Sequence, residues 1–141
     1  MIVLVAIAGL ALAACDRSDG ILDGHPSTLN GTVWRAVSIS GRPPVAGSEP
    51  TVVFGPSNAN GSSGCNSYGG VYTYDPSSGA IAFKDVAMTL MLCAEPARNV
   101  VESLFTEALN AATSASIDPQ GRLVLSGPGG EVLFVSMGRS G

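Results

Sequence analysis

The sequence is poor in the residues that most often perform catalysis or bind nucleic acid. It has a single histidine, His25, and only 13% of its 141 residues are charged. Because histidine is the commonest metal ligand and the usual proton carrier near neutral pH, one copy leaves little basis for a metal centre or for acid–base chemistry. Lysine and arginine number 7 against 11 aspartates and glutamates, so the net charge of −4 disfavours binding to a phosphate backbone. We therefore expect no metal, no cofactor and no nucleic-acid partner.

Long hydrophobic runs are also scarce, and the one at the start of the chain is short. Residues 2–14 are all apolar or glycine, fewer than the roughly 20 that a membrane-spanning helix needs, but enough for the hydrophobic region of an export signal. The run ends in Leu12-Ala13-Ala14-Cys15, which resembles a bacterial lipobox, where cleavage precedes a cysteine that carries lipid. No Lys or Arg precedes the run, unlike in most signals. The alternative is a buried apolar helix that ends in Cys15.

The lipobox interpretation divides the chain into three parts. We predict a signal peptide over residues 1–14, then lipidated Cys15 with a flexible polar tether over residues 15–28, then one domain over residues 29–138. His25 falls on the tether and is assigned no role. This organisation predicts a monomer attached to a membrane of the cell envelope by its lipid, facing the periplasm or the exterior.

From Leu29 onward the pattern is typical of β-strands separated by Gly, Pro, Asn and Ser clusters. Short glycine-containing connections between neighbouring runs predict hairpins, so the sheet should be mainly antiparallel. Apolar residues spaced by three and four predict one amphipathic helix over residues 96–112, which should cover an apolar face of the sheet. The fold class is therefore α+β, a small curved, barrel-like sheet with one helix. The six predicted strands span residues 32–39, 51–54, 70–74, 80–83, 123–126 and 131–137.

The domain offers no complete catalytic set. Ser62, Ser63 and Cys65 lie in a glycine-flanked stretch that does not fit a nucleophile elbow, and a tight turn leading into a strand explains it better. Glu102 and Glu107 are predicted to lie on the exposed side of the helix, and their spacing of five does not align them. We therefore expect that the protein is not an enzyme.

Two cysteines remain once Cys15 is assigned to the lipid. Cys65 and Cys93 lack a C-x-x-C pair and a useful histidine, so a structural zinc site would lack ligands. In an exported domain they are the only available pair for a disulfide, which we favour. Two separate buried thiols are the alternative.

Several blocks of the sequence resemble the META domain, the domain of HslJ-type heat-shock lipoproteins. The most specific parts are Gly64-Cys65-Asn66 and the Thr-x-Met-x-Cys pattern that ends at Cys93. The likeness covers about residues 29–137, and residues 57–63 depart from it where the family has a clearer strand. It implies a curved antiparallel sheet with one helix, and motif residues with structural rather than catalytic roles. These residues are Trp34, Gly64, Asn66, Tyr68, Gly70, Tyr72, Thr89 and Met91.

The resemblance also sets the functional expectations. The family is linked to heat shock and to tolerance of the antibiotic novobiocin and has no accepted enzymatic activity. We therefore expect a non-enzymatic envelope lipoprotein that contributes to stress or antibiotic tolerance by binding an unknown envelope protein or ligand. The alternative is a pilot or assembly factor that binds a peptide of an outer-membrane channel subunit, either as a helix or as an added strand. An unrecognised hydrolase would need a base that the sequence does not show.

Overall fold

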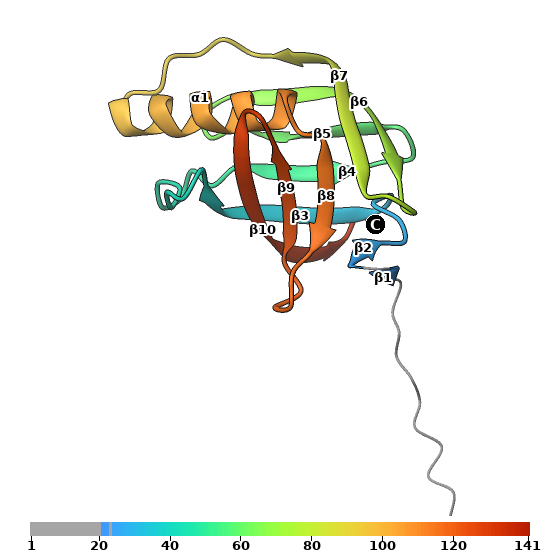
Figure 1. The fold of residues 1–141 in the computed structure, drawn as a ribbon. Helices are drawn as coiled ribbons and strands as arrows, with labels where there is room; N and C mark the ends of the chain where they lie inside the picture. The colour runs from blue at the N-terminus through green and yellow to red at the C-terminus, as the bar shows by residue number, and fades with distance from the viewer. Residues whose placement is uncertain (1–20, 23) are drawn as a thin grey trace, which may run out of the picture.

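The residues that the structure describes form an eight-stranded antiparallel barrel with one helix. The computed structural model describes residues 21–22 and 24–141. Within this part of the chain, the strands close in the order β10-β3-β4-β5-β6-β7-β8-β9 (Figure 1). The barrel strands are β3 (Thr32–Ile39), β4 (Thr51–Phe54), β5 (Asn58–Ser62), β6 (Ser67–Asp75), β7 (Ala80–Met88), β8 (Ser114–Ile117), β9 (Leu123–Gly127) and β10 (Gly130–Arg139).

The predicted class is confirmed, but the barrel has eight strands rather than about six. All six predicted strands form, and β6, β7 and β10 extend beyond their predicted ends. The prediction missed β5 and β8, which read Asn-Ala-Asn-Gly-Ser and Ser-Ala-Ser-Ile. Their most buried side chains are the small Ala59 and Ala115, at 1% and 0% exposure. Small inward residues leave room for larger ones in a narrow barrel, and they also erase the hydrophobic alternation that identifies a strand.

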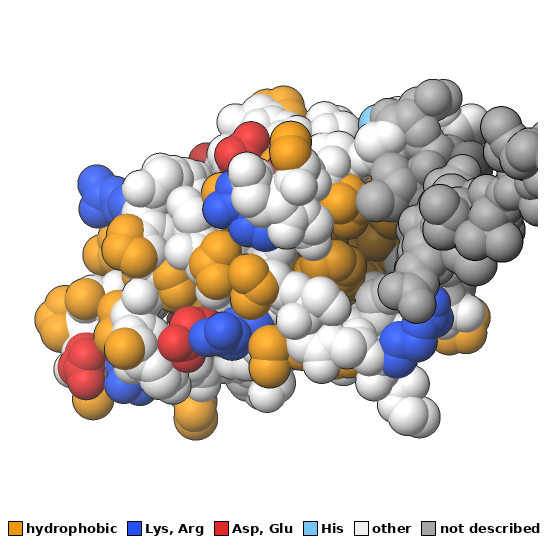
Figure 2. Space-filling view, turned by 90° about the horizontal axis from the view of Figure 1, so that it is seen from below, with side chains coloured by type: hydrophobic (Ala, Val, Ile, Leu, Met, Phe, Trp, Pro, Cys, Tyr) orange, Lys and Arg blue, Asp and Glu red, His pale blue; other side chains and the backbone are white. Residues whose placement is uncertain are grey.

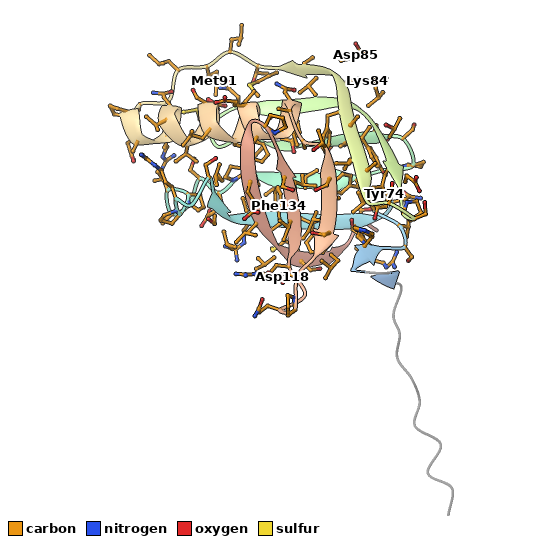
Figure 3. The ribbon with its side chains drawn as sticks, viewed as in Figure 1. Tyr74, Lys84, Asp85, Met91, Asp118 and Phe134 are labelled. Atoms are coloured by element: carbon orange, nitrogen blue, oxygen red, sulfur yellow. A yellow bond between two sulfur atoms is a disulfide. The ribbon has the colours of Figure 1, made fainter. Side chains whose placement is uncertain are left out.

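Helix α1 (Pro96–Asn110) packs on the barrel with the predicted apolar stripe. In Figure 1 the helix lies across one end of the barrel, and the connection from β7 runs back along it. Phe105 is fully buried, with its ring centroid 5.7 Å from that of Tyr68 and 6.4 Å from that of Phe134. Phe134 lies on β10, where Figure 3 labels it, and is fully buried. The aromatic residues of sheet and helix thus form one continuous core.

Part of the predicted tether packs on the barrel. Two short strands, β1 (Ile21–Leu22) and β2 (His25–Pro26), form a hairpin, and the carbonyl of Gly24 accepts a 2.7 Å hydrogen bond from the amide of Ile117. His25 lies on this hairpin, and its Nδ1 is 3.2 Å from the carbonyl oxygen of Ala115. The predicted signal peptide and Cys15 lie outside the described residues.

Three buried aromatic motif residues pair their polar atoms inside the sheet. Trp34 donates from Nε1 to Thr32 Oγ1 at 2.8 Å. The hydroxyls of Tyr68 and Tyr72 each donate to a backbone carbonyl at 2.7 Å, on Thr51 and on Gly55 respectively. Burial raises the pKa of both tyrosines above the ordinary value.

The two motif glycines occupy positions that disfavour any side chain. Gly64 has φ +132°, a backbone conformation that L-residues rarely adopt. Gly70 lies at a β-bulge in β6, where a Cβ would stand 2.9 Å from the carbonyl oxygen of Lys84. At both positions the absence of a side chain lets the backbone adopt the observed conformation.

The surface away from α1 carries mixed side chains. Figure 2, viewed from below, shows acidic, basic and apolar groups interspersed on this face. Within the described part of the chain, no helix has both the length and the apolar character needed to cross a membrane.

Candidate functional site

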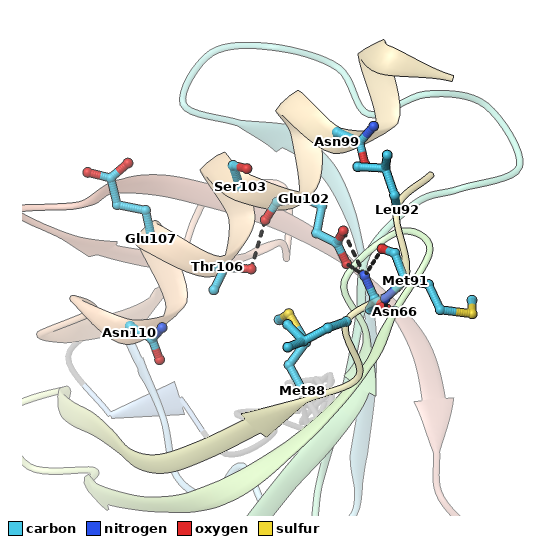
Figure 4. Close-up of a pocket in the computed structure, with 11 residues that line it drawn as sticks. Asn66, Met88, Met91, Leu92, Asn99, Glu102, Ser103, Thr106, Glu107 and Asn110 are labelled. Carbon is cyan, nitrogen blue, oxygen red and sulfur yellow. Dashed lines mark hydrogen bonds between the residues drawn. The ribbon is translucent and has the colours of Figure 1, made fainter. Parts of the chain in front are cut away.

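A buried polar network lies where the β5–β6 turn meets α1 and the β7–α1 connection. Asn66, 5% exposed, is its centre. Its Oδ1 accepts hydrogen bonds from Thr89 Oγ1 at 2.9 Å and from the amide of Met91 at 2.7 Å. Its Nδ2 donates to the Met91 carbonyl at 2.9 Å and to both carboxyl oxygens of Glu102 at 2.8 and 2.9 Å (Figure 4). One amide side chain therefore joins the turn, the connection and the helix.

Glu102 is buried, which corrects the prediction that it lies on the exposed side of the helix. Only 9% of the residue is exposed, while Glu107 is exposed as predicted. Oε1 of Glu102 also forms a close hydrogen bond with the hydroxyl of Ser63, a fully buried side chain. A carboxyl group can be buried here because Asn66 and Ser63 supply the hydrogen bonds that water would otherwise supply.

The Cys65–Cys93 disulfide is present, as predicted. It links the β5–β6 turn to the β7–α1 connection, with 5.8 Å between the two Cα atoms and a sequence separation of 28 residues. Closing a loop of this size stabilises a fold by roughly 3–4 kcal/mol through the entropy of the unfolded chain. Oε2 of Glu102 lies 3.3 Å from Cys65 Sγ and 3.8 Å from Cys93 Sγ. Since a disulfide carries no S–H, these are packing contacts between the carboxyl group and the sulfurs.

The β7–α1 connection (residues 89–95) is fixed along one edge and open along the other. Both backbone groups of Met91 bond to the Asn66 side chain, and both backbone groups of Cys93 bond to the side chain of Asn99, at 2.9 and 3.1 Å. Among the described residues, the backbone groups of Leu90 and Leu92 have no hydrogen-bond partner. Alternate residues of an extended chain direct their backbone groups to opposite sides, so a free edge faces outward.

The same connection exposes three large apolar side chains in succession. Leu90, Met91 and Leu92 are 94%, 64% and 87% exposed. Figure 3 shows Met91 on the connection above α1, away from the core. A run of exposed apolar groups of this kind is a common mark of a binding surface.

A groove lies between the connection and α1 (Figure 4). Its volume is about 650 Å³, within the range of small-ligand and peptide sites. The connection side is apolar and the helix side is polar, and the buried Asn66 and Glu102 form part of its wall. The principal lining residues are Met88, Met91 and Leu92 on one side and Ser103, Thr106 and Asn110 on the other.

Sequence reasoning found part of this site and missed the rest. The resemblance singled out Asn66, Thr89 and Met91, and the structure brings all three together. It did not find the partner role of Glu102 or the free edge at Leu90 and Leu92. The one available signal was the position of Glu102 directly after Val101 on the apolar stripe of the helix.

The fold and the site together define a small antiparallel barrel whose one helix is held by a disulfide and an asparagine-centred network. The chain belongs to the META domain family, which matches residues 27–138. It is similar to a solved structure described as a protein from Burkholderia xenovorans, with a TM-score of 0.64, 21% identity, and coverage of 98% of this chain and 99% of that one. A second solved structure has a TM-score of 0.60, 25% identity, and coverage of 77% of this chain and 91% of that one. No curated protein matches the sequence.

Proposed function

We propose that this META domain is a non-enzymatic binding module of the bacterial cell envelope, which holds another envelope protein in the groove beside α1. The observation that carries the proposal is the exposure of Leu90 and Leu92, at 94% and 87%, at the edge of that groove. Leaving such groups in water gives up about 1.5–3 kcal/mol for each leucine relative to full burial. A partner that covers them recovers part of this free energy on binding.

Binding rather than catalysis is supported by how the polar groups of the site are used. The Ser63 hydroxyl, the Asn66 amide and the Glu102 carboxyl are bonded to one another or to backbone groups inside the domain. A nucleophile needs a base and access to a substrate, whereas Ser63 is fully buried. These groups are suited to holding the groove in shape.

Attachment to the envelope belongs to the same proposal. The string Leu12-Ala13-Ala14-Cys15 and the polar stretch that follows it support lipidation at Cys15. The test is to express wild-type protein and a Cys15→Ser variant in the producing bacterium and to compare their partition into detergent. The wild type should enter the detergent phase and the variant should not. Equal partition would contradict lipidation at this residue.

The binding surface is tested with a crosslinker on the opposite wall of the groove. A photoreactive residue at Ser103 should give a discrete protein adduct in intact cells. The double substitution Leu90→Ser and Leu92→Ser should abolish the adduct and leave the free energy of unfolding within about 0.5 kcal/mol, because both side chains are exposed. Met137→Ser, which removes an exposed apolar side chain of β10, is the matched control and should retain the adduct. An adduct that persists in the double variant would exclude this surface.

A pilot or assembly role is the second candidate, and the free backbone edge of the connection favours it. Leu90 and Leu92 leave four backbone groups available, which an extended peptide could pair with as an added strand. If the Ser103 adduct is a segment of an outer-membrane channel subunit, this second role is correct. If the partner is another envelope protein and a deletion strain secretes normally but is sensitive to novobiocin, the proposed role in stress tolerance is supported instead.

A further inference from the structure

We propose that reduction of the Cys65–Cys93 disulfide creates a binding site for a divalent ion of the zinc type, with Glu102 as the third ligand. The two sulfurs and a carboxyl oxygen of Glu102 all lie within 4.8 Å of one another. In the sequence, no further metal ligand is evident for the two cysteines. In the structure, α1 brings the Glu102 carboxyl group to them as a third ligand.

The separations suit tetrahedral coordination. Zinc binds thiolate sulfur at about 2.3 Å and carboxylate oxygen at about 2.0 Å, so two such ligands of one tetrahedron stand about 3.5 Å apart. The distances from Glu102 Oε2 to the sulfurs of Cys65 and Cys93, 3.3 and 3.8 Å, lie on either side of this value. Once the disulfide is reduced, the sulfurs must separate to about 3.8 Å, which a rotation of either cysteine side chain supplies.

The surroundings hold the third ligand and leave room for a fourth. Asn66 and Ser63 bond to the Glu102 carboxyl and fix its orientation, as the outer partners of metal ligands commonly do. A cavity of about 70 Å³ adjoins the sulfurs and is lined by both cysteines, Ala94, Glu95 and Arg98. This volume accommodates a water molecule as the fourth ligand.

The chemistry proceeds in two steps. A dithiol reductant attacks the disulfide, leaves as its own cyclic disulfide, and gives its two hydrogens and two electrons to Cys65 and Cys93 as thiols. The divalent ion then binds both sulfurs as thiolates, and two protons are released to solvent. The ion thereby replaces the covalent cross-link and keeps the β7–α1 connection on the β5–β6 turn under reducing conditions.

The test uses Co²⁺ as a spectroscopic probe of the whole domain. Protein reduced with dithiothreitol and freed of it without oxygen should bind one Co²⁺ per chain, with a thiolate-to-cobalt charge-transfer band that Zn²⁺ abolishes. The oxidised protein should show no band. Glu102→Gln should weaken binding at least about tenfold, and the matched control Glu131→Gln, an exposed carboxyl on β10, should not change it.

Two results would overturn the proposal. One is the absence of a charge-transfer band in the reduced wild type. The other is equal affinity of the wild type and Glu102→Gln, which would mean that two thiols alone capture the ion. If Glu102→Gln does not fold, a crystal structure of the zinc-loaded reduced wild type decides the question. A Glu102 carboxyl oxygen at about 2.0–2.2 Å from the ion supports the site, while an ion held by the two sulfurs and water alone contradicts it.

Discussion

The Asn66 side chain offers the sharpest test of how the site is held together. Replacing Asn66 with alanine removes every hydrogen bond between the β5–β6 turn and Met91, and two of those that Glu102 accepts. The backbone groups of Met91 lie on an exposed connection, so water can replace part of what they lose. The Glu102 carboxyl is buried and keeps only Ser63.

The size of the effect follows from these contacts. A buried hydrogen bond contributes about 1 kcal/mol net, one to a charged group contributes about 1.5–3 kcal/mol, and a buried group left without a partner costs about 1–3 kcal/mol. Because the bonds share one amide and some lost partners are hydrated, their sum overstates the loss. We expect Asn66→Ala to lower the free energy of unfolding by about 3 kcal/mol.

Urea denaturation followed by circular dichroism measures this change. The matched control is Asn60→Ala, an exposed asparagine of the neighbouring strand β5 whose side chain forms no hydrogen bond in the described structure, and it should change stability by less than about 0.5 kcal/mol. Asn66→Asp keeps the acceptor for Met91 but places a second carboxyl against Glu102, so at neutral pH it should be at least as destabilising as alanine. A loss below about 1 kcal/mol for Asn66→Ala would refute the network as a principal support of the site.

Three further measurements follow from the structure. Cys93→Ser should lower the free energy of unfolding by roughly 3–4 kcal/mol under oxidising conditions, and a change below about 1 kcal/mol would show that the cross-link contributes little. Burial, with Asp75 beside it, raises the pKa of Tyr74 to about 12. The folded state therefore holds this proton more tightly than the unfolded state, and stability should fall as pH rises from about 10 to about 12. Tyr74→Phe should make that fall shallower, and an unchanged slope would contradict the assignment. In amide hydrogen exchange, Met91 and Cys93 should be protected, while Leu90 and Leu92 exchange freely, and uniform exchange across the four would contradict the two-sided connection.

Local composition is sufficient to predict the strands that are rich in β-branched and aromatic residues and are bounded by turn residues. β3 reads Thr-Val-Trp-Arg-Ala-Val-Ser-Ile and β4 reads Thr-Val-Val-Phe, and both were predicted with their observed bounds. The apolar stripe of α1 likewise identifies a helix. β5 and β8 could not be found in this way, because their pairing is imposed by neighbours on both sides and their buried residues are alanines.

The site depends on contacts that are distant in sequence. Glu102 lies 39 residues from Ser63 and 36 from Asn66, so nothing near Glu102 in the chain shows that its carboxyl will be satisfied when buried. The sequence pattern places Glu102 at the border of the apolar stripe, where side chains are usually exposed. Glu102 is buried because the β5–β6 turn packs against the helix at this point. The cysteine pair follows from the hypothesis that the domain is exported and that Cys15 carries lipid, because the two cysteines that then remain have one possible bond.

The exposed edge of the β7–α1 connection is the feature on which the proposed function rests. The most direct measurement places a photoreactive residue at Leu90 or Leu92, and at the exposed Gln120 and Ser77 as controls, in the protein expressed in intact cells of its own bacterium. The account predicts one adduct of the same mass from both connection positions and none of that mass from the controls. The same adducts from all four positions, or none from Leu90 and Leu92, would contradict it.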